Sequence, residues 1–163
     1  DTLKVTFKEN LYLMDFPSRL PKLLENFDLS QLYEALGKKP VKVVSFRDLI
    51  AIFDNEDDIR SLRPDMEKLK QLEFPSIVAT SIGRNADFVS RNFAPKLGIP
   101  EDPVTGSTHC ELIPYWSEVL NKKQMIAHQL SDRGGIIYCG NYHNRVSIGG
   151  EAVTFLRGEI EVL

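Results

Sequence analysis

The ten residues EDPVTGSTHC, 101–110, combine side chains that could bind an anion with one that could move a proton. An apolar run follows Thr105, Gly106 and Ser107, so a helix is expected to begin there and to leave its first backbone N–H groups without partners. The helix dipole adds partial positive charge at such an end, and glycine allows close approach, so this helix start would bind a carboxylate or a phosphate. Asp102 stands just before it, and we expect its carboxylate to transfer a proton or to bind an amine.

A structural interpretation of the same residues stays open, because Asp102, Thr105 and Ser107 are also the residue types that commonly cap helices. His109, in the first turn of an apolar helix, is expected to be a hydrogen-bonded core residue. For Cys110 we expect a buried structural thiol.

The composition restricts the class of protein. The chain has 163 residues, 42% hydrophobic and 26% charged, with a net charge of −3, which is typical of one globular domain. No apolar run reaches the ~18 residues that a membrane-spanning helix needs. The scattered basic residues argue against a nucleic-acid partner. Two cysteines without metal-ligand spacing predict reduced thiols, no metal site and a cytoplasmic location.

The hydrophobic pattern predicts an α+β chain. Strands are expected in a hairpin over residues 1–16 and in PVKVVSF, LIAIFD, PSIVATSIG, MIAHQL, IIYC, RVSI, AVTFL and EIEVL. Helices are expected in LSQLYEALG with Ser30 as N-cap and Gly37 as C-cap, in NEDDIRSLRPDMEKLKQL interrupted near Pro64, and over about 107–120. Pro114 inside the last helix favours a kink. The pair Gly134–Gly135 is explained equally by close approach of a ligand and by a tight turn.

Several of these segments, in this order, resemble one known family. SRNFAPKLGIPEDPVTGSTHCELIPYW, HQLSDRGG and VSIGGEAVTFLRGEIEV resemble the C-terminal half of the PhzF-like (phenazine biosynthesis-like) proteins, from about Asp87 to the end. LYLMDFP is similar to the strand that ends the family's first half, and the match is loose between Pro21 and Phe74.

The resemblance implies a diaminopimelate-epimerase-like fold, in which each half is a curved mixed β-sheet wrapped around a central helix. It implies a cofactor-independent isomerase or epimerase that acts on a small carboxylate-bearing substrate in the cleft between two halves. By the same resemblance, Asp102 contacts the substrate and helps to protonate it, while Thr105, Gly106 and Ser107 bind its polar groups. No cofactor and no metal are implied.

The resemblance also implies that the family's first half, with its acid–base glutamate, precedes this chain. Residues 1–16 would then finish that half, and residues 17–163 would form the C-terminal domain. We expect the missing N-terminal half to be a partner and this chain alone to be inactive; a homodimer is left open. The alternative hypothesis is a non-catalytic module that binds a metabolite or a protein.

Overall fold

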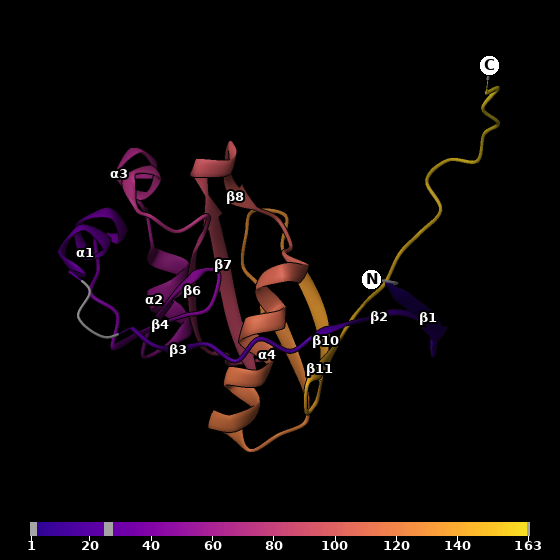
Figure 1. Cartoon of the computed structure of the whole chain (residues 1–163), viewed down its shortest axis with the longest axis horizontal. Coiled ribbons are helices and arrows are strands. Elements are labelled where there is room, and N and C mark those ends of the chain that lie inside the picture. Colours follow the sequence, from indigo (N-terminus) through magenta and orange to yellow (C-terminus); the bar gives the residue numbers. More distant parts are fainter. Residues whose placement is uncertain (1–2, 25–27, 163) are drawn as a thin grey trace.

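The computed structural model describes residues 3–24 and 28–162, and among these eleven strands form one mixed sheet (Figure 1). The order is β1-β2-β11-β10-β9-β7-β6-β5-β4-β3, and β8 pairs with β7 outside this path. The strands are β1 (Lys4–Lys8), β2 (Leu11–Pro17), β3 (Lys22–Leu23), β4 (Lys42–Ser45), β5 (Leu49–Ile52), β6 (Ile77–Ile82), β7 (Phe88–Ala94), β8 (Ile99–Asp102), β9 (Gln124–Gln129), β10 (Gly135–Tyr142) and β11 (Arg145–Gly150).

The helices lie on two sides of this sheet (Figure 1). They are α1 (Ser30–Leu36), α2 (Glu56–Ser61), α3 (Met66–Gln71) and α4 (Gly106–Leu120), with a 3-10 turn η1 (Pro95–Leu97). Apolar residues of α1, α2 and α3 pack into one core cluster, and those of α4 pack into a second cluster on the opposite face. The long helix α4 therefore has one face of the sheet to itself.

The strands in the middle of the sheet are buried on both faces. In β5, Leu49 and Ala51 belong to the cluster of α1–α3, whereas Ile50 and Ile52 belong to the cluster of α4. A strand that alternates between two cores reads as a continuous apolar run, which is why LIAIF shows no polar alternation. The strands on the α4 side differ: Ala127 and Ile137 pack under α4, while Ile126 and Ile136 on the other face are exposed.

The proline inside α4 is accommodated without interrupting the helix. Pro114 has no N–H to donate to the carbonyl four residues earlier, which is that of Cys110. The backbone N–H of Arg19 donates to this carbonyl instead, over 2.9 Å. The segment after β2 thus supplies the missing hydrogen bond, and the helix runs from Gly106 to Leu120.

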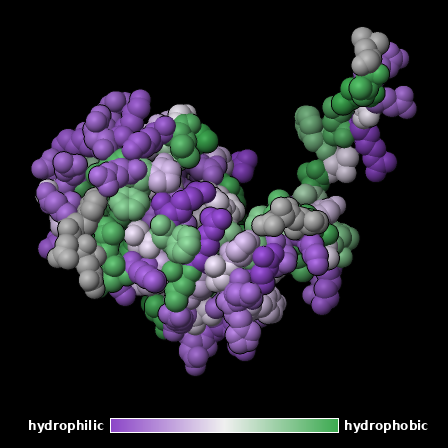
Figure 2. Space-filling view, in the orientation of Figure 1, coloured by the Kyte–Doolittle hydropathy of each residue, from purple (hydrophilic) through white to green (hydrophobic). Residues whose placement is uncertain are grey.

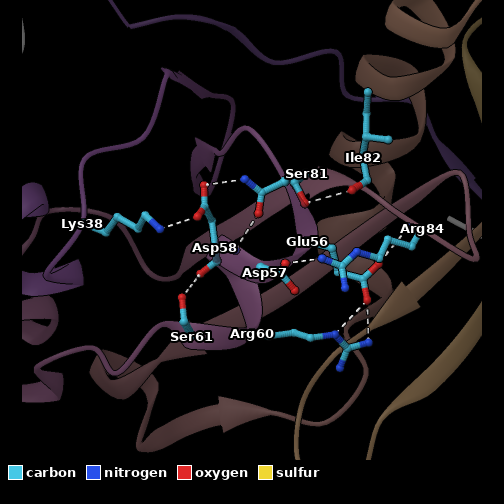
Figure 3. A network of polar contacts seen from close by, with 10 residues as sticks. Lys38, Glu56, Asp57, Asp58, Arg60, Ser61, Ser81, Ile82 and Arg84 are labelled. Atoms are coloured by element: carbon cyan, nitrogen blue, oxygen red, sulfur yellow. Dashed lines mark hydrogen bonds and ion pairs between the residues drawn. The ribbon is translucent and has the colours of Figure 1, made fainter.

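A polar network joins α2 to the loop after β6 (Figure 3). The buried carboxylate of Glu56 accepts hydrogen bonds from the Arg60 side chain and from the backbone N–H of Arg84, each over 2.8 Å. These contacts lower the pKa of Glu56 against the opposing effect of burial, which is the largest single cause acting on it. Further ion pairs of the network are Arg84–Asp57 and Lys38–Asp58.

Most of the predicted elements are present, and two predictions need correction. The predicted hairpin turns through Glu9 and Asn10 at φ of 52° and 64°, and α2 and α3 are separate helices on either side of Pro64, where the interruption was predicted. Ser30 is not an N-cap, because α1 begins at this residue and its own N–H donates to the Asp28 side chain. Gly37 does cap the C-terminus, at φ 67°. The helix α4 continues through Pro114 without a break in its assignment.

The second correction concerns residues 151–162, where strands AVTFL and EIEVL were expected. This segment has no secondary structure and extends away from the body (Figure 1). Its apolar side chains are exposed, Phe155 by 98% and Ile160 by 89%, as Figure 2 shows for the segment as a whole. Strand propensity alone forms no strand where no neighbouring strand provides hydrogen-bond partners.

Within the described part of the chain, no helix is long and apolar enough to cross a membrane.

Candidate active site at the start of helix α4

The first turn of α4 is not closed by a side chain. Thr105 is the N-cap, with extended backbone at φ −116° and ψ 102°, but its side chain makes no capping hydrogen bond to the helix. Its own N–H donates to Oε1 of Gln129 in β9 over 2.9 Å. The N–H groups of the first turn therefore keep their capacity to bind an anion, and Thr105 occupies the N-cap position without making the side-chain hydrogen bond of a capping residue.

The hydroxyl of Thr105 is used in another direction, toward Asp102 at the end of β8. Thr105 Oγ1 donates to Asp102 Oδ2 over 2.6 Å. The amide of Gln129, which is 1% exposed, donates to the Asp102 carbonyl over 2.7 Å and to Thr105 Oγ1 over 3.1 Å. Ser131 Oγ also donates to the carbonyl of Pro103 over 2.8 Å. These bonds from β9 and the loop after it position the half-buried Asp102 carboxylate beside the helix start.

A cavity of about 520 Å³ opens at this helix start, between α4 and strands β2, β10 and β11. Thr105 and Gly106 line it, and a Cβ on Gly106 would meet no atom within 4 Å, so this glycine leaves the backbone open. Arg133 contributes a cation, and Glu151 an acid. The remaining lining residues are Met14, Val104, His109, Gly135, Ile136, Ile137, Tyr138, Ile148, Gly149 and Gly150. The start of α4, which has no side-chain cap, thus faces a largely apolar chamber.

Ser107 lies on another flank of the helix start, beside Arg47. Arg47 Nη2 donates to Ser107 Oγ over 3.2 Å, and Arg47 Nε donates to Oδ1 of Asp48 over 3.0 Å. Asp48 is fully buried and also accepts from Thr108 Oγ1 over 2.9 Å. Asn92 in β7 donates to the same Thr108 hydroxyl over 2.9 Å. The sequence FRD before β5 is thus connected to the first turn of α4, and to β7, through a buried chain of hydrogen bonds.

A second buried carboxyl group, Glu111, lies next to Asp48. The backbone N–H of Asp48 donates to Glu111 Oε2 over 3.3 Å, and Oε1 has no partner among the described residues. Desolvation raises the pKa of Glu111 to about 7, and the negative charge of Asp48 acts in the same direction. The carboxyl groups of Glu111, in α4, and of Asp48, before β5, are therefore buried next to each other, and the pKa of Glu111 is about 7.

His109 is the core histidine that the sequence predicted, and it also lines the cavity. Its ring is fully buried, and Nδ1 lies 2.7 Å from the Thr105 carbonyl oxygen. Burial lowers the pKa of His109 to about 4, so the ring is neutral at pH 7. Cys110 is buried as predicted, and desolvation raises the pKa of its thiol.

The structure brings together only some of the predicted site residues. Thr105 and Gly106 line the cavity, Asp102 is hydrogen-bonded to Thr105 beside it, and Ser107 faces Arg47. Sequence reasoning missed five residues that shape this region, namely Arg47, Asp48, Glu111, Gln129 and Arg133. The Gly134–Gly135 pair was the one local signal near Arg133: Gly134 adopts φ 69°, and Gly135 lines the cavity. The described residues contain no group of three or more histidine, cysteine or acidic side chains that could hold a metal ion.

Comparison with known proteins gives consistent matches along almost the whole chain. The family described as phenazine biosynthesis-like protein (PhzC-PhzF) matches residues 3–158. An uncharacterized isomerase of Pseudomonas aeruginosa is 42% identical over 98% of this chain. Another, from Halalkalibacterium halodurans, is 43% identical over 90% of it.

Solved structures agree with these matches. The crystal structure of a PhzF-family phenazine biosynthesis protein from Enterococcus faecalis superposes with a TM-score of 0.90 at 42% identity, covering 97% of this chain and 60% of that one. A putative phenazine biosynthesis PhzC/PhzF protein from Clostridium difficile gives a TM-score of 0.88 at 46% identity, covering 98% and 61%.

The family match covers more of the chain than the sequence motifs alone indicated. It includes residues 21–74, where the resemblance was loose, so the expectation that only the C-terminal half of the family is present is not supported. The expectation of an inactive chain gains no support either. The chain spans 61% of the length of the P. aeruginosa relative and 56% of the H. halodurans relative.

Proposed function

The chain belongs to the phenazine biosynthesis-like protein (PhzC-PhzF) family, and from this we propose that it carries the site of an isomerase that moves a proton on a small carboxylate-bearing metabolite. Relatives named as uncharacterized isomerases support the reaction class. One observation supports the location: the uncapped start of α4 opens into a cavity that also contains Arg133, with the Asp102 carboxylate alongside.

In the proposed mechanism the substrate carboxylate binds to the first N–H groups of α4, near Gly106, and to the guanidinium of Arg133. Ser107, on the other flank of the helix start, accepts a hydrogen bond from Arg47 and keeps its own hydroxyl proton for a substrate group that extends from the cavity toward that flank. Anchoring the carboxylate in this way fixes the neighbouring carbon relative to the protein, which is the main requirement for an efficient proton transfer.

Asp102 is the proposed proton-transfer group. The hydrogen bond from Thr105 Oγ1 orients its carboxylate and leaves lone pairs on both oxygens for a substrate proton. The proposed reaction requires no oxidant or reductant, because the proton leaves one carbon and returns to the same or a neighbouring atom with no net change of oxidation state. We propose that the second acid–base group belongs to the part of the relatives' length that this chain does not span, arranged as a second half across a cleft.

Hydrogen–deuterium exchange tests this proposal. The protein is incubated in D2O with a panel of small carboxylates, and loss of the C–H signal next to the carboxylate is followed by proton NMR. We expect exchange with at least one acid and a loss of about 100-fold or more in Asp102→Asn, the usual range for general acid–base catalysis. Asp132→Asn is the matched control, because this exposed acid lies outside the cavity lining. Carboxylate binding without exchange by any acid would contradict an isomerase.

A further inference from the structure

We propose that Arg91 and Glu101 are positioning residues for Asp102: their ion pair holds strand β8 in place, and β8 carries Asp102 to the start of α4. This inference rests on the proposed function for the role of Asp102 as the proton-transfer group. It adds two residues on the opposite face of the sheet, neither of which is among the residues that line the cavity at the start of α4.

The ion pair between Arg91 in β7 and Glu101 in β8 has the geometry of a fork. Arg91 Nε donates to Glu101 Oε1 over 2.7 Å, and Arg91 Nη2 donates to Glu101 Oε2 over 2.8 Å. Both side chains are largely enclosed, being 12% and 19% exposed. Two parallel hydrogen bonds determine the orientation of a carboxylate as well as its distance, so Glu101 is fixed more firmly than a residue of an exposed ion pair.

Arg91 is itself held by three further contacts. Its Nη1 donates to the carbonyl oxygens of Ile59 and Leu62 at the end of α2, over 3.2 and 3.0 Å. The guanidinium carbon lies 4.9 Å from the centre of the Phe93 ring, a favourable distance for a cation above an aromatic ring. Rotation of the guanidinium group would break at least one of these contacts. Arg91 therefore gives Glu101 a fixed partner.

Strand β8 has little else to determine its position along β7. It contains four residues and, among the described strands, it pairs with β7 alone (Figure 1). Asn92 lies opposite Asp102 and Ala94 lies opposite Ile99, and the register shifts between these two pairs. Such an irregularity interrupts the ladder of backbone hydrogen bonds. The side-chain fork next to Asp102 supplies a constraint that the ladder lacks.

Glu101 and Asp102 are neighbours in the chain but lie on opposite faces of the sheet, because successive side chains of a strand alternate. Glu101 meets Arg91 on the side of α2, and Asp102 accepts from Thr105 Oγ1 over 2.6 Å on the side of α4. One peptide unit joins the two residues, so a shift of Glu101 displaces the Asp102 carboxylate. A displacement of about 1 Å can lower the rate of a reaction about 100-fold.

Rate and binding measured separately test the inference. Hydrogen–deuterium exchange and dissociation constants are measured by NMR with lactate, propionate and alanine, and the acid that the parent chain exchanges fastest is used for the variants. Glu101→Gln breaks the fork, because its amide group offers Arg91 only one acceptor. We expect the exchange rate at saturating acid to fall about 10- to 100-fold and the dissociation constant to stay unchanged, since the carboxylate binds elsewhere, at the start of α4.

Arg91→Lys should lower the exchange rate as much as Glu101→Gln, because an ammonium group cannot form the fork. The double variant should lose no more than either single variant, since the two residues act as a unit. Exchange at the parent rate in both single variants would overturn the inference. Losses that multiply in the double variant would also overturn it.

Arg63→Lys is the matched control. Arg63 Nη1 donates to the carbonyl oxygens of Arg60 and Leu62 over 3.0 and 2.7 Å, so this arginine also holds the end of α2. Within the described part of the chain it makes no hydrogen bond or ion pair with β8. Arg63→Lys should keep the parent exchange rate. A loss equal to that of Arg91→Lys would show that only the packing of α2 matters, and would overturn the inference.

The side-chain amide of Gln129 reports the position of β8 without any reaction. This amide donates to the Asp102 carbonyl oxygen over 2.7 Å, so its 15N and proton signals depend on where Asp102 lies. Glu101→Gln should shift these signals, and Arg63→Lys should leave them in place. If the parent chain exchanges none of the three acids, the proposed function fails while this readout still decides. Signals that stay unchanged in Glu101→Gln would overturn the inference.

A milder variant covers the case in which Glu101→Gln does not fold. Glu101→Asp keeps the negative charge but is one methylene shorter, so β8 must move toward Arg91 to keep the fork. The Gln129 amide signals should therefore shift, and exchange should slow although the charge is retained. Parent signals together with the parent exchange rate in Glu101→Asp would show that Asp102 does not depend on this pair, and would overturn the inference.

Discussion

Val104 and Gly135 fit together so closely that a Cβ atom on Gly135 would overlap Cγ2 of Val104. Gly135→Ala should therefore lower the free energy of unfolding by about 1–3 kcal/mol, the usual cost of overpacking. Val104→Ala in the same chain should recover most of this loss, because it removes the atom in conflict. Gly150→Ala is the control within the same cavity, since its Cβ would meet nothing within 4 Å. Urea denaturation measures all three, and equal losses in Gly135→Ala and Gly150→Ala would contradict the packing argument.

The hydrogen bond from Arg19 to the Cys110 carbonyl can be tested as a cycle. Arg19→Pro removes the donor and should cost about 1–3 kcal/mol of unfolding free energy, because a buried carbonyl is left unpaired. Arg19→Ala keeps the backbone N–H and serves as the control. In a Pro114→Ala background the helix can again supply its own N–H to Cys110, so the cost of Arg19→Pro should shrink. A cost that is independent of residue 114 would assign the loss to backbone strain at Arg19 instead.

Between pH 4.5 and 6.5, two buried groups make the free energy of unfolding depend on pH, and their effects are opposite in direction. The pKa of His109 is about 4 in the folded chain, below its usual 6.5, so the unfolded chain binds more protons between these values and stability rises with pH there. The pKa of Glu111 is about 7, above its usual 4.5, so stability falls as pH rises between those values. Each contribution is about 3 kcal/mol, and the two should nearly cancel between pH 4.5 and 6.5.

Single substitutions should reveal each slope separately. Glu111→Gln removes the contribution that decreases as pH rises. The unfolding free energy of this variant should therefore increase by about 3 kcal/mol from pH 4.5 to 6.5, because the His109 contribution remains. His109→Asn should show the opposite, a decline over the same interval. Urea denaturation at a series of pH values measures both, with the parent chain as the reference. If both variants keep the flat profile of the parent, neither group titrates as described.

Asp48 is a cause of the raised pKa of Glu111, second to desolvation. Asp48→Asn removes the negative charge at similar volume, so the pKa of Glu111 should fall below 7 but remain above 4.5, because burial persists. Carbon-13 NMR of the glutamate carboxyl groups can follow this titration. Asp132→Asn should leave it unchanged. A pKa of Glu111 that does not respond to Asp48→Asn would show that desolvation alone controls it.

Much of the fold follows from local pattern. Strands such as IVATSI, the break near Pro64 and the helix after Thr105 are encoded by periodicity and by residues that end helices, and the structure contains all of them. The errors have tertiary causes. The strands expected after residue 150 are absent because no described strand pairs with them, and the hydrogen bond lost at Pro114 is replaced by Arg19 from a distant segment.

The site was predictable to a smaller extent. The motif around Asp102 and Gly106 shows a helix start beside an acid, and that arrangement is present. Arg47 and Glu111 gave no signal, because their role depends on the packing of the segment before β5 against the first turns of α4. The sequence also contains no sign that the first turn of α4 lacks a side-chain cap, because the Thr105 hydroxyl is hydrogen-bonded to Asp102 and not to the helix backbone. A preference for capping residues cannot reveal which of two partners a hydroxyl selects.

The pairing of β2 with β11 sets the order in which the chain can complete its fold. Arg145 and Asp15, in these two strands, form an ion pair at 2.8 Å although they are 130 residues apart. During synthesis the hairpin of β1 and β2 is made well before the strand that receives it, because the paired residues Asp15 and Arg145 are 130 residues apart. Contacts between such distant segments form slowly, because a long loop must close first. The hairpin, with Val5 and Phe7 exposed even in the finished structure, therefore stays undocked until β11 has been made, and its apolar side chains are open to non-native contacts during that time.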